Sequence, residues 1–314
     1  MLINLLPDFL DILAQSDPEA AFRRYLDAHH QLLAAYWSNY VLDLESPHAG
    51  EVIANALRAD RSDLRELLDQ VDVVQLADEA LARSEEVLRV DRPTDCVLMV
   101  GMGGANAGEL VVGGHGLAFI CVEHFTGRPN PDTHGMGLGP EQLPLWVAHE
   151  IAHTIRYTST ESASEMRRLV DDAGGYYDYW TTGSRATLRE LLLNEGLAVH
   201  AAQAVVPGLD PADYFGYPHR HYQRLRELDA YLRRAAHHDL DRSGLGLRLK
   251  YLSGGMSPAA RLSLGRVLPE RCGYYLGYRM AEPLVKARGI AAALRAGAAD
   301  FQVLEDEAFG FRTA

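Results

Sequence analysis

Two histidines and a glutamate stand in an otherwise apolar stretch, LPLWVAHEIAHTIRY, which spans residues 143–157. His149 and His153 are four residues apart, so on a helix they lie on one face and can reach the same ion. Glu150 falls at the edge of that face, where it can touch a water molecule beside the ion. The H-E-x-x-H spacing therefore predicts a helix that supplies two metal ligands and a general base.

The apolar neighbours of this motif argue against a solvated helix face. Val147, Ala148, Ile151 and Ala152 surround the three polar residues, so we expect much of the helix to be buried. Buried imidazoles and carboxylates are costly unless they have partners. The alternative is an amphipathic helix whose polar face carries these residues by chance.

A third ligand is expected in residues 184–206, SRATLRELLLNEGLAVHAAQAVV. Ser184 can cap a helix there, and Glu195 fills the one gap in its apolar stripe. That stripe consists of Leu188, Leu191, Leu192, Ala198, Val199 and Ala202. A catalytic zinc site takes three protein ligands, and a lone carboxylate on a buried face needs a partner. We therefore predict Glu195 as the third ligand of Zn2+, with a buried ion pair to an arginine as the alternative. Glu190 falls off the stripe and is expected to be solvated.

Four further histidines are candidates for lesser roles. His200 lies five residues after Glu195, about 140° around a helix, so we expect it beside the site or at the surface rather than among the ligands. His115, His124 and His134 flank the site in sequence, and the pattern does not choose among them for substrate contact.

The segments VAHEIAH and LNEGLAVH together resemble the gluzincin metallopeptidases, the clan of thermolysin and the zinc aminopeptidases. The resemblance implies that His149, His153 and Glu195 bind zinc and that Glu150 is the general base. The chain is more similar still to a bacterial family of predicted zinc-dependent proteases, in which a helix near the C-terminus carries G-Y-x-x-G-Y. Here that motif reads GYYLGY, at residues 273–278.

Two departures from the gluzincin pattern matter. Thermolysin-like enzymes have an aspartate four residues after the glutamate ligand, but this chain has Val199 there, so another group must orient the zinc-bound histidine. The aminopeptidase motif G-x-M-E-N is also absent. GMGGANAG, at residues 101–108, lies in a similar place without a carboxylate.

The reaction that the resemblance implies is peptide-bond hydrolysis by a metal-activated water, with Glu150 moving the proton to the leaving amine. A tyrosine hydroxyl is expected to stabilise the developing oxyanion. Tyr274 and Tyr278 share one helix face and are the candidates, with ordinary packing of both rings as the alternative. Gly273 and Gly277, also four apart, would let that helix approach a neighbour closely.

Two other functions fit the same residues. A zinc hydrolase of a non-peptide amide or ester would use the same site. A non-catalytic zinc-binding protein that retains the protease fold would need the metal ligands only, so the presence of Glu150 argues against it.

The elements that must position these residues are mostly helical. Residues 1–92 are predicted to form an N-terminal helical region, whose purpose the sequence does not show. Residues 93–314 are predicted to form a zincin-like metallopeptidase domain. Short apolar runs in its first part indicate a small antiparallel sheet, in which the strand at 117–122 could pair with an extended peptide. The H-E-x-x-H helix begins near Pro140, and a helical subdomain follows it. The expected fold class is therefore α+β, mostly α.

The composition of the chain limits the kinds of partner that we expect it to bind. The chain has 314 residues and a formal net charge of −13, which argues against nucleic acid or an anionic membrane and leaves a peptide or protein substrate. Cys96, Cys121 and Cys272 are too few and too scattered for a disulfide framework, so we expect buried, reduced thiols. The N-terminus lacks the basic start of a signal peptide. These features favour a cytoplasmic protein, and the oligomeric state stays open.

Overall fold

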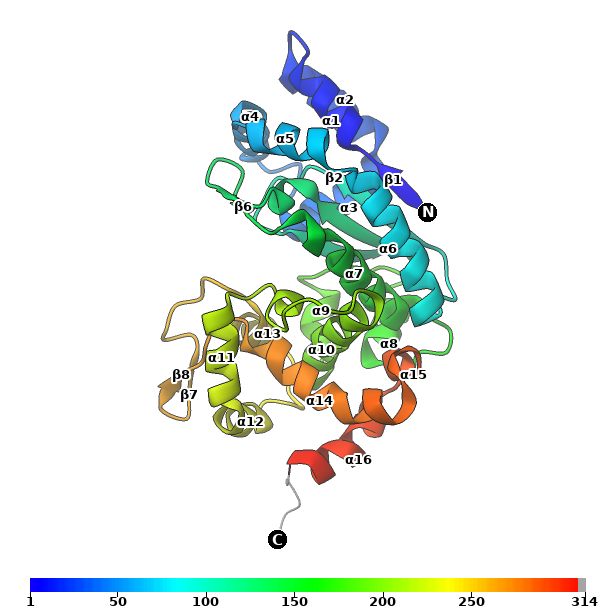
Figure 1. Cartoon of the computed structure of the whole chain (residues 1–314), viewed down its shortest axis with the longest axis vertical. Helices are drawn as coiled ribbons and strands as arrows, with labels where there is room; N and C mark the ends of the chain where they lie inside the picture. The colour runs from blue at the N-terminus through cyan, green and yellow to red at the C-terminus, as the bar shows by residue number, and fades with distance from the viewer. Residues whose placement is uncertain (310–314) are drawn as a thin grey trace.

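Helices dominate the chain in the computed structural model, which describes residues 1–309 (Figure 1). The strands are β1 (Leu2–Asn4), β2 (Thr94–Met99), β3 (Ala107–Val112), β4 (His115–Cys121), β5 (Pro129–Asn130), β6 (Gly135–Met136), β7 (Leu262–Ser263) and β8 (Arg266–Val267). The helices of the first half are α1 (Leu6–Leu13), α2 (Pro18–Ala28), α3 (His30–Tyr40), α4 (Ala49–Arg58), α5 (Ser62–Gln70), α6 (Val73–Leu88) and α7 (Leu143–Thr158). Those of the second half are α8 (Glu165–Asp172), α9 (Thr182–Arg185), α10 (Leu188–Val205), α11 (His219–Glu227), α12 (Asp229–His237), α13 (Leu245–Leu252), α14 (Cys272–Arg288), α15 (Ile290–Arg295) and α16 (Ala298–Phe309). The predicted class, α+β and mostly α, is confirmed.

The main sheet is mixed, so the prediction of an antiparallel sheet is wrong. Its strand order is β1-β2-β4-β3, with β1 and β4 both parallel to β2 and only β3 antiparallel to β4. Strand β1, from the N-terminal region, aligns Leu2 with Cys96. The loop after β2 leaves room for one strand, so that β3 forms the edge of the sheet. A two-residue turn at Gly113 and Gly114 then brings β4 back between β2 and β3. Both glycines have positive φ, as this tight hairpin turn requires.

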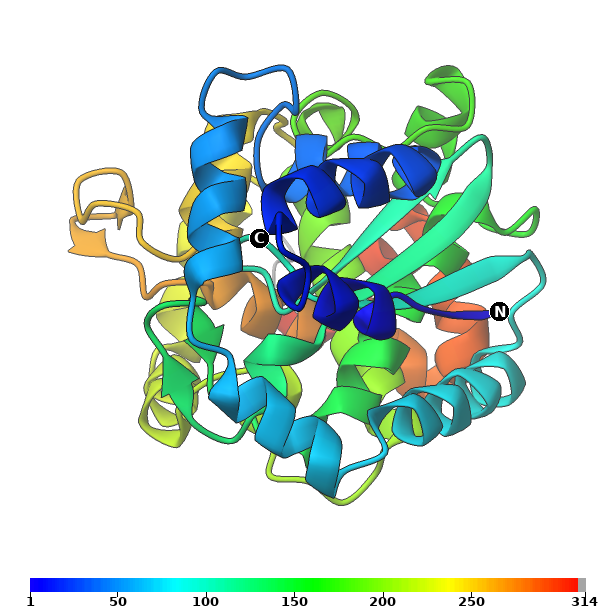
Figure 2. The ribbon, with the colours of Figure 1, turned by 90° about the horizontal axis from the view of Figure 1, so that it is seen from above.

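Alternating side chains of β4 face two different helical layers. Phe119 and Cys121 meet Tyr36 of α3, whose ring lies 5.5 Å from that of Phe119. Gly116 and Ala118 point to the other face, towards α7. Viewed from above, α1, α2 and α3 lie over the sheet, while α7 lies beneath it and packs against α6 (Figure 2). The small residues on the α7 side of β4 let that helix pack closely against the sheet.

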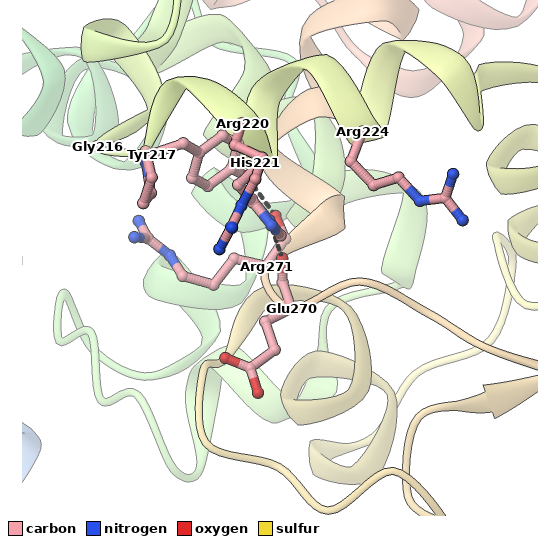
Figure 3. A pocket seen from close by; sticks show the side chains of 8 residues that line it. Gly216, Tyr217, Arg220, His221, Arg224, Glu270 and Arg271 are labelled. Carbon is pink, nitrogen blue, oxygen red and sulfur yellow. Dashed lines mark hydrogen bonds between the residues drawn. The ribbon is translucent and has the colours of Figure 1, made fainter.

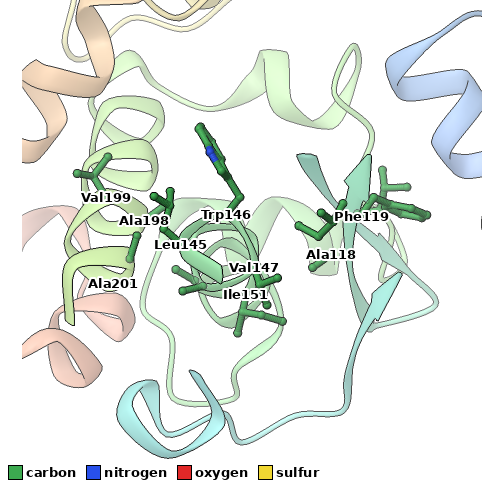
Figure 4. Close-up of a cluster of buried hydrophobic side chains, with 14 of the residues drawn as sticks. Ala118, Phe119, Leu145, Trp146, Val147, Ile151, Ala198, Val199 and Ala201 are labelled. Atoms are coloured by element: carbon green, nitrogen blue, oxygen red, sulfur yellow. The ribbon is translucent and has the colours of Figure 1, made fainter. Parts of the chain in front are cut away.

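Helix α7 is buried on all sides because it lies between the sheet and α10 (Figure 4). Apart from Pro144, every residue of α7 is buried, and α10 is buried over nearly its whole length. Helix α10 begins at Leu188, and the side-chain oxygen of Thr187 accepts a hydrogen bond from the amide of Glu190. Ser184, the predicted cap, lies in the separate short helix α9.

Glycines allow α14 to pack directly on α10. A Cβ at Gly196 would overlap the backbone carbonyl of Gly277, and a Cβ at Gly277 would overlap the carbonyl of Leu192. Gly273 lies against Leu192 and Leu252 in the same way. The prediction that Gly273 and Gly277 permit a close helix approach is therefore confirmed.

The three cysteines are free and buried, as expected. Within residues 1–309, none of the helices combines the length and the apolar character that a membrane span needs.

Candidate metal centre

His149, His153 and Glu195 come together where α7 crosses α10. Glu195 Oε2 lies 3.4 Å from His149 Nε2 and 3.6 Å from His153 Nε2. All three residues are at most 9% exposed. The spacing within α7 aligns the two imidazoles, and the gap in the apolar stripe of α10 presents the carboxylate to them. The three residues predicted as ligands are thus brought to one point.

The protonation of these groups suits a cation. Burial lowers the pKa of His149 to about 3 and also lowers the pKa of His153, so both rings are neutral near pH 7. Neutral imidazole is the form that binds metal. Burial raises the pKa of Glu195, and this effect outweighs the opposite influence of His153, Arg248 and Arg271. Glu195 Oε2 makes no hydrogen bond with any residue of the described chain.

The spacing of the donor atoms fits zinc. A tetrahedral site with bonds of about 2.0–2.1 Å separates its ligand atoms by roughly 3.3 Å. The two measured nitrogen–oxygen distances, 3.4 and 3.6 Å, are close to that edge. They are also longer than ordinary hydrogen bonds, so these contacts do not satisfy Glu195 by themselves.

A second group of possible ligands overlaps the first. Glu109, Glu150 and His153 also bring one ligand atom each within 4.8 Å of the others. Glu109, however, already accepts a hydrogen bond from Tyr157 at 2.8 Å. Because Glu195 Oε2 has no hydrogen bond, the first group is the better metal site.

A hydrogen-bonded chain of three side chains lies beside His153. Asn194 lies beside His153 and donates to the hydroxyl of Tyr157 at 2.8 Å. Tyr157 in turn donates to Glu109. Burial works to raise the pKa of Glu109, but the nearby cationic groups and this hydrogen bond together lower it. The sequence analysis missed Glu109, Tyr157 and Asn194, although a single carboxylate in the apolar strand β3 was a usable signal.

Glu150 faces a cavity of about 420 Å³ that the metal site also lines. Its carboxyl group makes no hydrogen bond with a side chain or backbone group of residues 1–303. Burial raises its pKa well above the ordinary value, and the neighbouring Glu109 and Glu195 raise it further. A carboxyl group that faces the cavity beside three ligand atoms has the position of a general base.

The structure separates the two predicted tyrosines. Tyr274 lines the cavity, and its ring lies 6.3 Å from that of His149. Tyr278 stacks on His200 at 4.1 Å, outside the residues that line the cavity. His200 is buried, with Nε2 3.0 Å from the carbonyl of Tyr278. One of the pair is therefore brought to the site and the other is not.

None of the three histidines that flank the site in sequence lines the cavity within the described residues. His115 Nε2 lies 2.9 Å from Asp95 at the far end of the sheet. His124 is fully buried, and His134 lines a separate pocket of about 160 Å³.

The edge strand along the cavity is β3, not the predicted strand at 117–122, which is interior to the sheet. The outer edge of β3 is already in use. The carbonyl of Glu109 accepts from Tyr40, and the carbonyl of Val111 accepts from the amide of Tyr177. Strand pairing therefore gives no support to peptide binding at this sheet.

Comparison with known proteins supports a zinc protease. Residues 176–302 match the model of a family described as "Predicted Zn-dependent protease (DUF2268)". The matched segment includes Glu195 and the GYYLGY motif, while His149, Glu150 and His153 lie before it. No curated protein and no solved structure matches the chain.

Proposed function

We propose that this chain is a zinc-dependent peptidase whose metal is held by His149, His153 and Glu195. The observation that carries the proposal is the convergence of three buried ligand atoms with no adequate partner of their own, next to the unused carboxyl group of Glu150. The match of residues 176–302 to a family of predicted zinc proteases supports the same reaction class.

In the proposed reaction, each residue of the site has a separate role. When bound, zinc would supply a Lewis acid that polarises a substrate carbonyl and acidifies water. A carboxylate oxygen of Glu150 takes a proton from the attacking water and delivers it to the leaving amine nitrogen. A raised pKa suits this role, because the group must hold the proton between the two transfers.

Tyr274 is the oxyanion donor in this proposal. Burial raises the pKa of its hydroxyl, and the neighbouring Glu195 raises it further, so the group stays protonated and can donate. A donor fixed in a buried cavity stabilises charge that develops on the carbonyl oxygen. Tyr278, which packs on His200, takes no part. Asn194, Tyr157 and Glu109 hold the ring of His153 in place.

The test is Glu150→Gln, which keeps the side-chain shape but cannot take a proton. We expect turnover of a peptide mixture to fall by about 10²–10⁴-fold, while zinc content stays as in the wild type. The matched control is Glu141→Gln, an exposed carboxylate just before α7, which should leave both quantities unchanged. Full activity in Glu150→Gln would overturn the proposed mechanism.

A further inference from the structure

A second pocket adjoins the metal-site cavity. It has a volume of about 530 Å³, and its wall includes Arg271, Arg220, Arg224 and Tyr217 (Figure 3). Arg271 also lines the metal-site cavity, so its side chain stands at the boundary between the two spaces.

Two aromatic rings hold the guanidinium of Arg271. Its central carbon lies 4.5 Å from the ring centre of Tyr274 and 5.5 Å from that of Tyr217. Tyr274 is the residue assigned above as the oxyanion donor. The cation is therefore fixed next to the place where the scissile carbonyl would be bound.

Arg271 makes no ion pair with a carboxylate among residues 1–303, and the carboxylate that interacts with it electrostatically is Glu195, which lines the same cavity. The adjacent Glu270 points away from it, as Figure 3 shows, and lies 3.3 Å from Arg261 instead. Arg220 likewise has no ion pair among residues 1–303, and within the same residues Arg224 pairs with the exposed Glu227. A half-buried guanidinium without a close ion pair is costly, so a negatively charged ligand would be stabilised in this pocket.

The backbone at Arg271 adds a second observation. Its φ of 51° lies in the left-handed region, where glycine or asparagine is less strained than arginine. This conformation does not favour arginine, so the role of Arg271 is argued from what its side chain contacts.

We propose that Arg271 binds a carboxylate group of the substrate, so that the site prefers peptides with a carboxylate close to the cleaved bond. The guanidinium can bind both oxygens of a carboxylate at once. The carboxylate is either the C-terminus of the peptide or an acidic side chain. This inference rests on the proposed peptidase function.

Matched peptides separate the two sources. One pair differs only in a free or an amidated C-terminus, and a second, amidated pair differs only in Glu or Gln beside the cleaved bond. In the zinc-loaded wild type we expect kcat/KM to favour one acid over its neutral partner by about 10- to 100-fold. In Arg271→Asn, which relieves the backbone strain, that ratio should fall to about one.

Arg89→Asn is the matched control, because Arg89 has a φ of 54° and is exposed far from the site. It should keep the wild-type ratio. Preference in the first pair would assign the C-terminal carboxylate, and preference in the second an acidic side chain.

Calorimetric binding of the same peptides to zinc-loaded Glu150→Gln decides the inference independently of turnover. If the wild type cleaves no peptide, the proposed function fails. The carboxylate site is still supported if the acid binds more tightly than its neutral partner and if adding Arg271→Asn removes this difference. If acids and amides are cleaved and bound equally, the carboxylate site is overturned and the peptidase proposal stands.

Discussion

Helices α7 and α10 bring buried charged or chargeable groups together at two places. At the first, Glu190 Oε1 lies 2.6 Å from Arg156 Nη2, and both side chains are completely buried. At the second, Glu195 faces His149 and His153 at 3.4 and 3.6 Å, and among residues 1–303 no arginine or lysine forms an ion pair with it. The two carboxylates stand five residues apart on one helix.

The difference lies in where each carboxylate finds its positive charge. The chain itself supplies Arg156 to Glu190, and the same guanidinium donates to the carbonyls of Leu294 and Ala296 at 3.0 and 3.3 Å. This contact ties together α7, α10 and the end of α15. Glu195 makes no such ion pair, although Arg248 and Arg271 of the same cavity act on it electrostatically, and we expect a bound cation to supply its close positive charge. We therefore interpret the ion pair of Arg156 with Glu190 as a contact that holds the helices together, and the group of Glu195 and the two histidines as a metal-binding site.

The largest effect on stability is expected from breaking the ion pair between Arg156 and Glu190. Arg156→Met leaves Glu190 buried without a partner, and we expect the free energy of unfolding to fall by about 3–5 kcal/mol. Chemical denaturation of the metal-free protein measures this. Adding Glu190→Leu removes the stranded charge as well, and the double variant should regain most of the loss. If Arg156→Met were as stable as the wild type, the ion pair would not hold the helices together.

The close packing of α14 on α10 gives a second test of how tightly α10 is enclosed. Gly277→Ala should lower the free energy of unfolding by about 1–3 kcal/mol, because the new methyl group overlaps the carbonyl of Leu192. Gly246→Ala is the control, since Gly246 lies exposed in α13 with nothing near its missing Cβ. It should stabilise the chain by about 0.5–1 kcal/mol. Equal effects of the two changes would refute the close packing.

The last effect concerns His200, another buried ionisable residue of α10, and it is absent at neutral pH. Burial lowers its pKa to about 4, against about 6.5 in the unfolded chain. Between these values the unfolded state binds more protons, so this contribution is complete above pH 6.5 and is lost as the pH falls towards 4. We expect the stability difference between wild type and His200→Gln to change by about 1.4 kcal/mol per pH unit in that window. A difference that does not vary with pH would show that His200 is solvated.

The sequence analysis succeeded where the geometry is local. Residues four apart on a helix share a face, which is why the spacing alone aligned His149 with His153 and placed Glu150 beside them. It erred at Glu190, because the argument assumed that α10 has a solvent face. Since α10 is buried nearly all round, a residue off the apolar stripe is buried too, and its partner Arg156 stands only three residues after His153.

Other features depend on contacts that are distant in sequence. The directions of the strands follow from the path of the loop after β2 and from the pairing of Leu2 with Cys96, neither of which leaves a local pattern. Tyr274 and Tyr278 share a helix face, yet four residues also advance along the axis by about 6 Å. That step is enough to put one ring in the cavity and the other against His200.

The most direct test of the difference between the two contacts is the zinc content of the purified chain, measured by elemental mass spectrometry without added metal. The account predicts about one zinc per wild-type chain, a sharp loss in Glu195→Ala, and full retention in the folded double variant Arg156→Met with Glu190→Leu. A wild type that takes up no zinc even when it is supplied, or a Glu195→Ala variant that keeps it, would contradict the account.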